Sequence, residues 1–190
     1  MTSNDYLQIA LYLGALLLLA KPLGNYMACV FSDAPNRVTR LGAGVERVLY
    51  RVCGIHPEED MGWKQYAWAM LVFNLLGLLA VYALQRLQLW LPLNPQHLPA
   101  VSPDSAMNTA ISFATNTDWQ GYGGESTMSY LTQMLGLAVQ NFLSAATGIA
   151  VLIAVIRGFV RRSSQGIGNF WVDLTRSTLY LLVPLSLLLP

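Results

Sequence analysis

The chain has 190 residues, of which 54% are hydrophobic and 11% are charged. An ordinary soluble domain carries roughly 25% charged residues, and 11 basic with 10 acidic side chains are too few to cover a globule of this size in water. The net charge of +1 lacks the clustered basic surplus that phosphate binding needs, which argues against nucleic acid as a partner. We therefore expect an all-α integral membrane protein.

Four apolar runs are candidates for membrane spans, because a helix needs about 20 mostly apolar residues to cross. They cover residues 6–31, 65–84, 128–156 and a last run from near Leu174 to Pro190. The first run is not a typical secretory signal peptide, since no basic residue precedes it. A complete protein rarely ends inside an apolar run, so we expect a fragment of a longer chain.

The basic residues predict the orientation of these spans. Ten of the eleven fall in the segments 21–64 and 157–176, whereas the segment 85–127 holds only Arg86. Cytoplasmic loops carry the excess of Lys and Arg. The two basic segments are therefore predicted to be cytoplasmic and the N-terminus to lie outside.

A short amphipathic helix is predicted within the first basic segment. Its apolar residues recur at helical spacing, and they are Val45, Val48, Leu49 and Val52. Glu46, Arg47 and Arg51 are expected on the opposite side of this helix. Such a helix lies on the membrane surface. It either docks a partner or packs at the interface, and the second interpretation is favoured.

The sequence between the second and third spans predicts a re-entrant loop. Four prolines in residues 92–103 forbid a continuous helix. Ser102, Pro103 and Asp104 then form a helix start. The helix 103–114 would be about 18 Å long, too short for a hydrocarbon core of roughly 30 Å. The alternative is an outer loop with a surface helix.

The polar segment 115–120 and three glycines follow this short helix. If the helix enters from outside, its C-terminal carbonyls point toward the membrane centre, where the negative end of the helix dipole favours a cation. The carbonyls of Thr115, Asn116 and Thr117 could then replace the hydration shell of a monovalent cation. Non-helical backbone at membrane depth is tolerated only where protein buries it or where it lines a watery cavity.

The third span carries a polar face, which comprises Ser129, Gln133, Gly136, Gln140, Asn141, Ser144, Thr147 and Gly148. Uncharged polar groups in a membrane usually face the interior of a bundle. Gln133, Gln140 and Asn141 are candidates to line a pore. Close packing of helices through small residues and amides is the alternative.

The sequence contains few features that would support an enzymatic activity. Cys53 and His56 supply only two ligands, too few for a zinc site, so no transition metal is expected. No GxxxxGK[ST] phosphate loop and no Asp-Lys-Thr-Gly phosphorylation motif occur. His56 and His97 would lie on opposite sides of the membrane, which excludes a serine triad built on both. Cys29 and Cys53 are expected to be free thiols.

The sequence resembles the N-terminal part of the potassium-binding A subunit family of the bacterial Kdp potassium-transporting ATPase. The blocks that carry the resemblance are GVERVLYRVCGI (44–55), MGWKQYAWAMLVFN (61–74), LPLNPQHLP (91–99), MNTAISFATNTDWQGYGGE (107–125), QNFLSAATGIAV (140–151) and GNFWVDLTRSTLYLLVPLSL (168–187). They occur in the family's order along nearly the whole chain.

The resemblance implies a potassium-channel-like build, with span, pore loop and span repeated four times after an extra helix. It divides the chain into an extra helix (1–31), a cytoplasmic loop with the amphipathic helix (32–64), the first repeat (65–156, with pore helix 103–114 and filter 115–120), a second cytoplasmic loop (157–172) and the truncated start of a second repeat (173–190).

The resemblance also implies the site. Filter residues Thr115, Asn116, Thr117, Asp118 and Gln120 are expected to bind K⁺, with the carbonyls of Asn116 and Thr117 facing the ion and Gln120 affecting affinity. The family pattern has asparagine where this chain has Asp118. An acid there would raise the local cation concentration or alter selectivity, unless it is protonated or faces outward.

The resemblance to this family also implies that the protein is located in the bacterial inner (plasma) membrane. A separate P-type subunit hydrolyses ATP there, small C and F subunits complete the complex, and this chain would bind no ATP. Two alternatives remain from the residues alone: a secondary cation transporter or channel with one broken-helix repeat, and a noncatalytic membrane scaffold.

Overall fold

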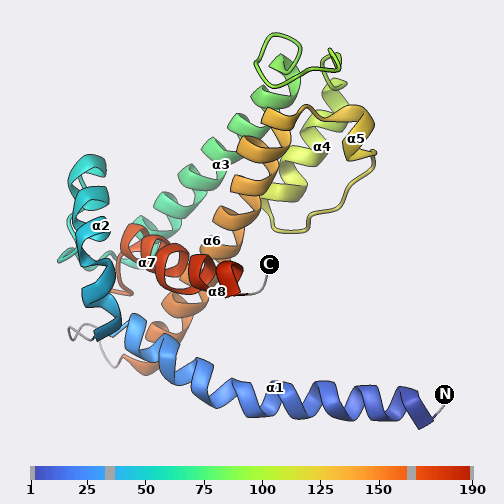
Figure 1. Ribbon diagram of the computed structural model, residues 1–190. Helices are drawn as coiled ribbons and strands as arrows, with labels where there is room; N and C mark the ends of the chain where they lie inside the picture. Colours follow the sequence, from blue (N-terminus) through green and yellow to red (C-terminus); the bar gives the residue numbers. More distant parts are fainter. Residues whose placement is uncertain (1–2, 33–36, 162–165, 189–190) are drawn as a thin grey trace.

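All the regular elements of the described residues are helices, as the composition predicts (Figure 1). The computed structural model describes residues 3–32, 37–161 and 166–188. Three helices within these ranges are long and apolar enough to cross a membrane, by length and composition. They are Asn4–Val30, Trp63–Leu87 and Thr132–Val160. The expected all-α membrane class is confirmed at this level.

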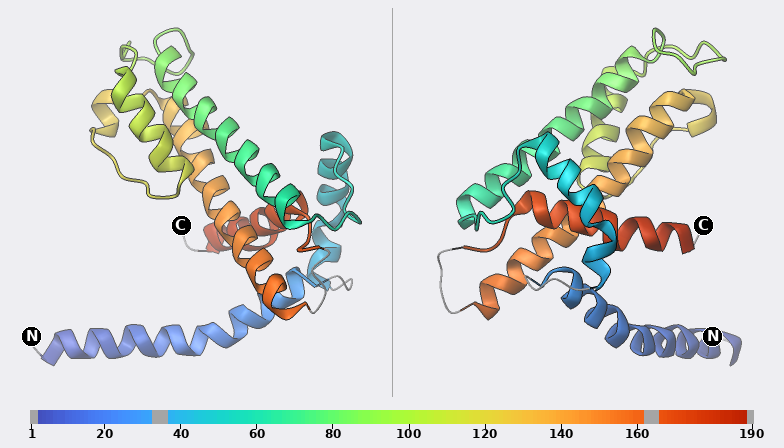
Figure 2. Two further views of the ribbon diagram at one scale, coloured as in Figure 1. Left: turned by 180° about the vertical axis from the view of Figure 1, so that it is seen from behind. Right: turned by 60° about the vertical axis from the view of Figure 1, so that its left-hand side comes forward.

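Two of these long helices form the body of the molecule. Helix α3 (Trp63–Leu87) and helix α6 (Val139–Val160) run side by side in all the views (Figures 1 and 2). Helix α1 (Ser3–Val30) projects away and touches the rest through its C-terminal end. There Val30 and Tyr26 pack in a cluster with Tyr180, and the Tyr26 hydroxyl donates to the Tyr180 carbonyl.

A π-helical segment, η1 (Thr132–Ala138), precedes α6 in the same continuous helix. A π turn adds one residue to the usual turn and therefore shifts the phase of every later side chain. A regular helical wheel does not anticipate this shift. Within α6 itself, Gln140, Ser144 and Thr147 of the predicted polar face are buried, whereas Asn141 is exposed.

Helix α4 (Pro103–Ala114) occupies the residues of the predicted short helix. It packs against α3 and α6 (Figure 1). Pro103 stands at its first position, and Ser102 caps it by position but without a side-chain hydrogen bond. Buried apolar side chains hold α4 in place, and they include Val81, Ala106, Ala110 and Phe113.

The chain then turns back along α4. Figure 1 shows the segment after α4 returning to the short helix α5 (Gly124–Thr127), near the end where α4 began. Because the chain enters and leaves at the same end, α4 and this segment form a hairpin rather than a crossing. The bounds of α4 agree with the predicted helix 103–114, and entry of this hairpin into a membrane stays a prediction.

Helix α7 (Phe170–Arg176), the π segment η2 (Ser177–Leu182) and α8 (Val183–Leu188) follow one another and cross α6 (Figure 2). The Asn169 side chain caps α7 by accepting from the backbone N–H groups of Trp171 and Val172. Phe170 is fully buried and packs edge-on against Tyr66 of α3. This segment is not among the three long apolar helices, so the fourth span stays a prediction.

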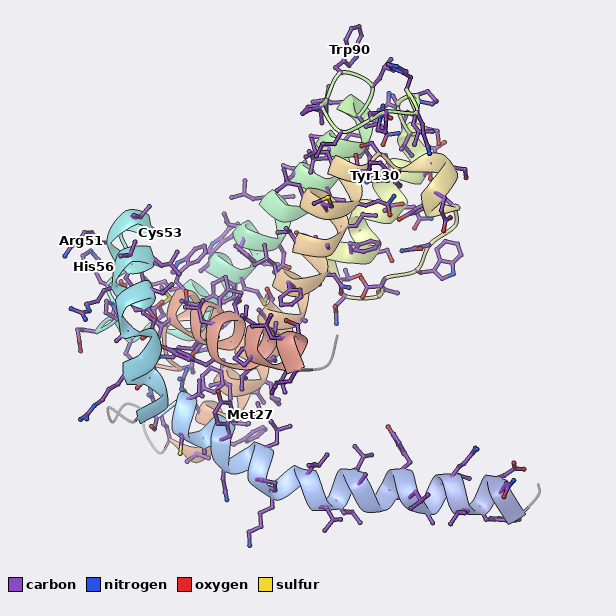
Figure 3. All side chains as sticks on the ribbon, viewed as in Figure 1. Met27, Arg51, Cys53, His56, Trp90 and Tyr130 are labelled. Atoms are coloured by element: carbon purple, nitrogen blue, oxygen red, sulfur yellow. The ribbon has the colours of Figure 1, made fainter. Side chains whose placement is uncertain are left out.

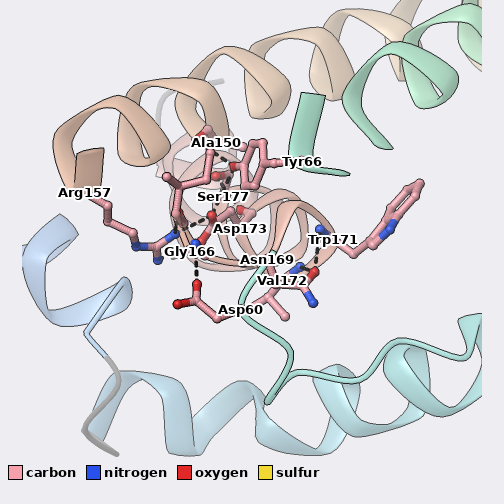
Figure 4. A network of polar contacts seen from close by, with 12 residues as sticks. Asp60, Tyr66, Ala150, Arg157, Gly166, Asn169, Trp171, Val172, Asp173 and Ser177 are labelled. Atoms are coloured by element: carbon pink, nitrogen blue, oxygen red, sulfur yellow. Dashed lines mark hydrogen bonds and ion pairs between the residues drawn. The ribbon is translucent and has the colours of Figure 1, made fainter. Parts of the chain in front are cut away.

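A buried ion pair connects α6 to α7 (Figure 4). The Arg157 guanidinium donates to both oxygens of Asp173, at 2.6 and 2.9 Å. The Tyr66 hydroxyl lies 3.1 Å from Asp173 Oδ2 and 2.8 Å from the Ala150 carbonyl, and these two acceptors share its one hydrogen. Asp173 is completely buried, and a buried carboxylate is tolerated because these donors satisfy it.

The helix predicted near residues 45–52 is α2 (Arg37–Cys53), and a polar residue of this helix is buried. Glu46 is buried rather than turned to solvent. Its Oε1 accepts hydrogen bonds from the Tyr50 hydroxyl at 2.9 Å and Arg176 Nε at 3.3 Å. Glu46 thus lies away from the exposed valines, as predicted, but that side of α2 faces other helices, and Arg176, 130 positions away, pairs with its charge.

Burial, followed by the nearby Glu46 carboxylate, raises the pKa of the Tyr50 phenol well above its usual range. Tyr50 therefore stays protonated and remains a donor to Glu46 at physiological pH. The apolar side chains of the same helix, Val45, Val48 and Val52, are all more than half exposed.

Candidate functional site

Two buried amides at the end of α3 hold the hairpin in position. The side-chain amide of Gln85 donates to the Ala106 carbonyl of α4 at 3.1 Å. The amide of Gln88 donates to the Pro99 and Thr127 carbonyls, at 2.6 and 2.8 Å. Both side chains are fully buried. They connect the proline-rich coil and α5 to α3, because irregular backbone offers carbonyls that need donors.

The turn after α4 is organised around Ser112. Its carbonyl accepts hydrogen bonds from the backbone N–H groups of Thr117 and Asp118, at 2.9 and 3.3 Å. Its hydroxyl accepts from the N–H group of Trp119 at 2.6 Å. One buried serine therefore fixes three consecutive residues of the turn. The role of Ser112 was not predicted from the sequence, and the available signal was a serine in the last turn of a mostly apolar short helix.

Every N–H group from residue 115 to residue 119 points back to α4. Besides the three bonds to Ser112, the N–H group of Thr115 donates to the Ile111 carbonyl at 2.9 Å, and that of Asn116 to the Phe113 carbonyl at 3.4 Å. The carbonyl oxygens of residues 115–118 accept no hydrogen bond from any residue that the structure describes. The turn therefore presents unpaired carbonyls and no unpaired N–H groups within this segment.

Two residues of the turn have left-handed backbone conformations. Asn116 and Asp118 each have φ of 55°. This region is uncommon for residues other than glycine, and Asn and Asp adopt it most readily. Residues in such conformations persist only where surrounding contacts hold them, and they cluster at binding sites. The bonds to Ser112 are the contacts that hold this turn.

The turn lies well along α6 rather than at its end. Ser144 of α6 donates its hydroxyl hydrogen to Asn116 Oδ1 at 3.1 Å. Ser144 is 12 residues from Thr132, the start of the candidate span. At 1.5 Å per residue this places Asn116 about 18 Å along a helix of about 43 Å.

The five predicted filter residues differ in exposure. The side chains of Thr115, Asn116, Thr117 and Gln120 are exposed, and Asp118 is half-buried. The hydroxyls of Thr115 and Thr117 share a hydrogen bond of 2.9 Å. Oδ1 of Asp118 is buried and has no hydrogen-bond partner among the described residues. The structure thus brings the five residues together in one turn.

The three candidates on the third span lie apart from one another. Gln140 is buried against Gly77 of α3, whose missing side chain leaves the space that the Gln140 amide fills. Gln133 donates to the Met128 carbonyl at 3.0 Å, near α5. Asn141 is exposed. In Figure 3 the side chain of Tyr130 lies near the start of the helix that continues into α6, far from Arg51 and Cys53 of α2.

The electrostatics of the turn favour a cation. It follows the C-terminal end of α4, where the helix dipole is negative, and it adds unpaired carbonyl oxygens in the same place. Asp118 contributes a carboxylate. Carbonyl oxygens are the ligands of monovalent cations in membrane filters.

Comparison with known proteins gives a consistent result over the whole chain. The family described as potassium-transporting ATPase A subunit (KdpA) matches residues 10–190. The chain is similar to the potassium-transporting ATPase potassium-binding subunit of Ralstonia nicotianae (strain ATCC BAA-1114 / GMI1000), with 70% identity over 182 residues, covering 96% of this chain and 31% of the relative. The protein of the same name from Methylococcus capsulatus is 68% identical over 189 residues, covering 100% of this chain and 32% of the relative. The chain thus spans about a third of the length of these curated relatives.

Proposed function

The chain belongs to the KdpA family of potassium-transporting ATPase A subunits, and on that basis we propose that residues 115–120 form one of the pore loops through which the full-length protein binds K⁺ from outside. In this proposal the ion loses part of its hydration shell to backbone carbonyls of Thr115, Asn116 and Thr117. The remaining ligands come from loops beyond this chain, so this chain alone would not select or transport potassium.

The unpaired carbonyls of the turn are the observation that carries the proposal. Five consecutive N–H groups bond back to α4, while the carbonyls of the same segment stay without donors among the described residues. An unpaired polar group away from water costs free energy. A weakly hydrated cation compensates for this cost without a fixed charge in the site, which suits K⁺ better than a divalent ion.

Asp118 is proposed to act electrostatically. Its carboxylate beside the carbonyls would raise the local concentration of cations, and this attraction should weaken with ionic strength. Replacing it by the family's asparagine, Asp118→Asn, is expected to raise the half-saturating potassium concentration at low but not at high ionic strength. If Asp118→Asn and the unmodified protein have the same half-saturating potassium concentration at both ionic strengths, Asp118 does not act in this way.

The full-length protein is proposed to work in an ATP-driven uptake complex. A P-type partner would hydrolyse ATP there and the small C and F subunits would complete the assembly, with this subunit contributing no hydrolysis. The orientation would place the hairpin of α4 outside and the basic segments in the cytoplasm of a bacterial inner membrane, because Lys and Arg concentrate on that side.

The test uses the full-length protein reconstituted with its partners and measures ATP hydrolysis against potassium concentration. Gln120→Arg places a positive charge beside the proposed ion, so the half-saturating potassium concentration should rise by at least tenfold. Gln96→Arg is the matched control, since it makes the same substitution at an exposed residue of the proline-rich coil. An unchanged potassium dependence in Gln120→Arg, with the complex assembled, would reject the proposed loop.

A further inference from the structure

A hydrogen bond joins the turn after α4 to helix α6, and the potassium proposal does not use it. Ser144 of α6 is only 4% exposed. Its hydroxyl lies 3.1 Å from Asn116 Oδ1 and 3.1 Å from the Asn141 carbonyl. Helices α4 and α6 pack against each other (Figures 1 and 2). Ser144 can therefore act on the turn from a helix other than α4.

The other hydrogen bonds that hold the turn come from α4. The backbone N–H groups of residues 115–119 all bond to that helix, and the Thr115 hydroxyl bonds to its Ile111 carbonyl at 2.9 Å. Within the described part of the chain, the Ser144–Asn116 bond is the only hydrogen bond between residues 115–120 and another helix. Its loss would leave the bonds to α4 intact and would free the turn from Ser144.

Asn116, which accepts this bond, is one of the two turn residues with a left-handed backbone. Its φ is 55°, and its N–H group makes only a long bond, of 3.4 Å, to the Phe113 carbonyl. Residues in such conformations persist where surrounding contacts hold them. Because the side chain and the carbonyl of Asn116 are joined through the same Cα, anchoring Oδ1 on α6 restricts the rotation of residue 116. The contact therefore helps to fix the direction of the Asn116 carbonyl.

The second acceptor makes the Ser144–Asn116 contact reversible. A hydroxyl has one hydrogen, so Asn116 Oδ1 and the Asn141 carbonyl share it. If Asn116 moves away, the hydrogen stays satisfied by the carbonyl three residues earlier in α6, a bond that serine commonly makes in helices. Breaking the contact leaves no buried donor unpaired and should cost the fold little. The contact thus suits positioning better than it suits holding the fold together.

We propose that Ser144 is a positioning residue for the potassium site. It orients the Asn116 carbonyl through the Asn116 side chain, and in this way it sets the affinity of the turn for the ion. This inference rests on the proposed pore loop and adds that the loop depends on α6 as well as on α4. A movement of α6 relative to α4 would therefore change the potassium affinity of the turn.

The test measures ATP hydrolysis against potassium concentration for the full-length protein reconstituted with its partners. Ser144→Ala removes one hydrogen bond and should raise the half-saturating potassium concentration about three- to tenfold. The maximal rate at saturating potassium and the thermal unfolding temperature of the complex should stay unchanged. A merely structural role of Ser144 would lower the unfolding temperature instead.

Thr147→Ala is the matched control, because it also removes a buried hydroxyl of α6. Thr147 is 7% exposed and bonds to the Leu143 carbonyl of its own helix at 2.9 Å. It makes no hydrogen bond to residues 115–120 among those that the structure describes, so its potassium dependence should match the unmodified protein. An unchanged half-saturating concentration in Ser144→Ala, or the same rise in both variants, would overturn the proposal.

A double-mutant cycle tests the path through the Asn116 side chain. Asn116→Gly removes that side chain, while glycine still adopts a positive φ readily. Ser144→Ala should then cause no further rise in the half-saturating concentration when it is added to Asn116→Gly, because the acceptor is already absent. An equal fold-rise from Ser144→Ala in both backgrounds would show that Ser144 does not act through Asn116.

Gln120→Arg in the same assay separates this inference from the proposed function. If Gln120→Arg raises the half-saturating potassium concentration and Ser144→Ala does not, the pore loop is supported and the role of Ser144 is rejected. If neither variant changes it, the pore loop is rejected and the role of Ser144 with it.

Discussion

At the scale of single residues, the turn after α4 depends on one residue that lies outside it. Ser112 is buried, and it accepts the N–H groups of Thr117, Asp118 and Trp119 through two of its oxygens. These bonds hold Asn116 and Asp118 at positive φ, a conformation that costs free energy unless its surroundings enforce it. Ser112 of α4 therefore orients the carbonyl groups of the turn.

The substitution Ser112→Ala tests this dependence. It removes the acceptor of the Trp119 N–H group, and a single hydrogen bond is worth about 0.5–1.5 kcal/mol. The half-saturating potassium concentration for ATP hydrolysis by the full-length complex should rise several-fold while the complex still assembles. Ser105, on the same helix, makes no hydrogen bond to residues 115–119 among the described residues, so Ser105→Ala should behave as the unmodified protein. If Ser112→Ala and Ser105→Ala both have the half-saturating potassium concentration of the unmodified protein, Ser112 does not position the site.

At the scale of elements, α3 and α6 are fitted together by a glycine. A Cβ on Gly77 would collide with the Gln140 side chain, and Gln140 is buried with its Nε2 lacking a partner among the described residues. Small residues allow such close approach between membrane helices. The contact fixes the spacing between the helix that holds α4 and the helix that touches Asn116.

Gly77→Ala is therefore expected to lower the thermal unfolding temperature of the full-length complex, because overpacking costs roughly 1–3 kcal/mol. Adding Gln140→Ala to Gly77→Ala shortens the opposing side chain. The double variant should recover part of the lost unfolding temperature, as expected for directly coupled residues. Gly14→Ala is the control, since no atom lies within 4 Å of a Cβ there. Additive effects of the two substitutions would show that these side chains do not meet.

At the scale of the whole molecule, the Arg157–Asp173 pair joins the long helix α6 to the segment that follows it (Figure 4). Removing one partner of a buried pair leaves an uncompensated charge and costs about 3–5 kcal/mol. Arg157→Ala should thus destabilise the full-length complex strongly in thermal unfolding. The double variant Arg157→Met with Asp173→Leu leaves no charge behind and should be less destabilised. A double variant worse than Arg157→Ala would contradict this explanation.

Much of the architecture follows from local sequence. Apolar length predicts the three long helices, and the prolines before residue 104 with the glycines after residue 120 predict a short helix that turns back. These features are readable because helix starts and chain reversals depend on neighbouring residues. The five candidate filter residues lie together for the same reason, since they are consecutive or nearly so.

The missed features depend on distant residues. Gln85 and Gln88 bond to carbonyls up to 39 positions away, and the burial of Glu46 depends on Arg176. The π segment η1 shifts the phase of the helix between Gln133 and the residues of α6, so Gln133 and Gln140 do not lie together as a regular wheel predicts. No local pattern encodes these contacts, because each needs the packed neighbour that satisfies it.

The central claim is that backbone carbonyls of residues 115–117 hold K⁺. Anomalous X-ray diffraction from crystals of the full-length protein with its partners, grown with rubidium in place of potassium, tests it most directly. The account predicts a rubidium peak in direct contact with carbonyl oxygens of Thr115, Asn116 or Thr117. Rubidium bound elsewhere in the pore, with those carbonyls facing water or protein donors, would contradict it.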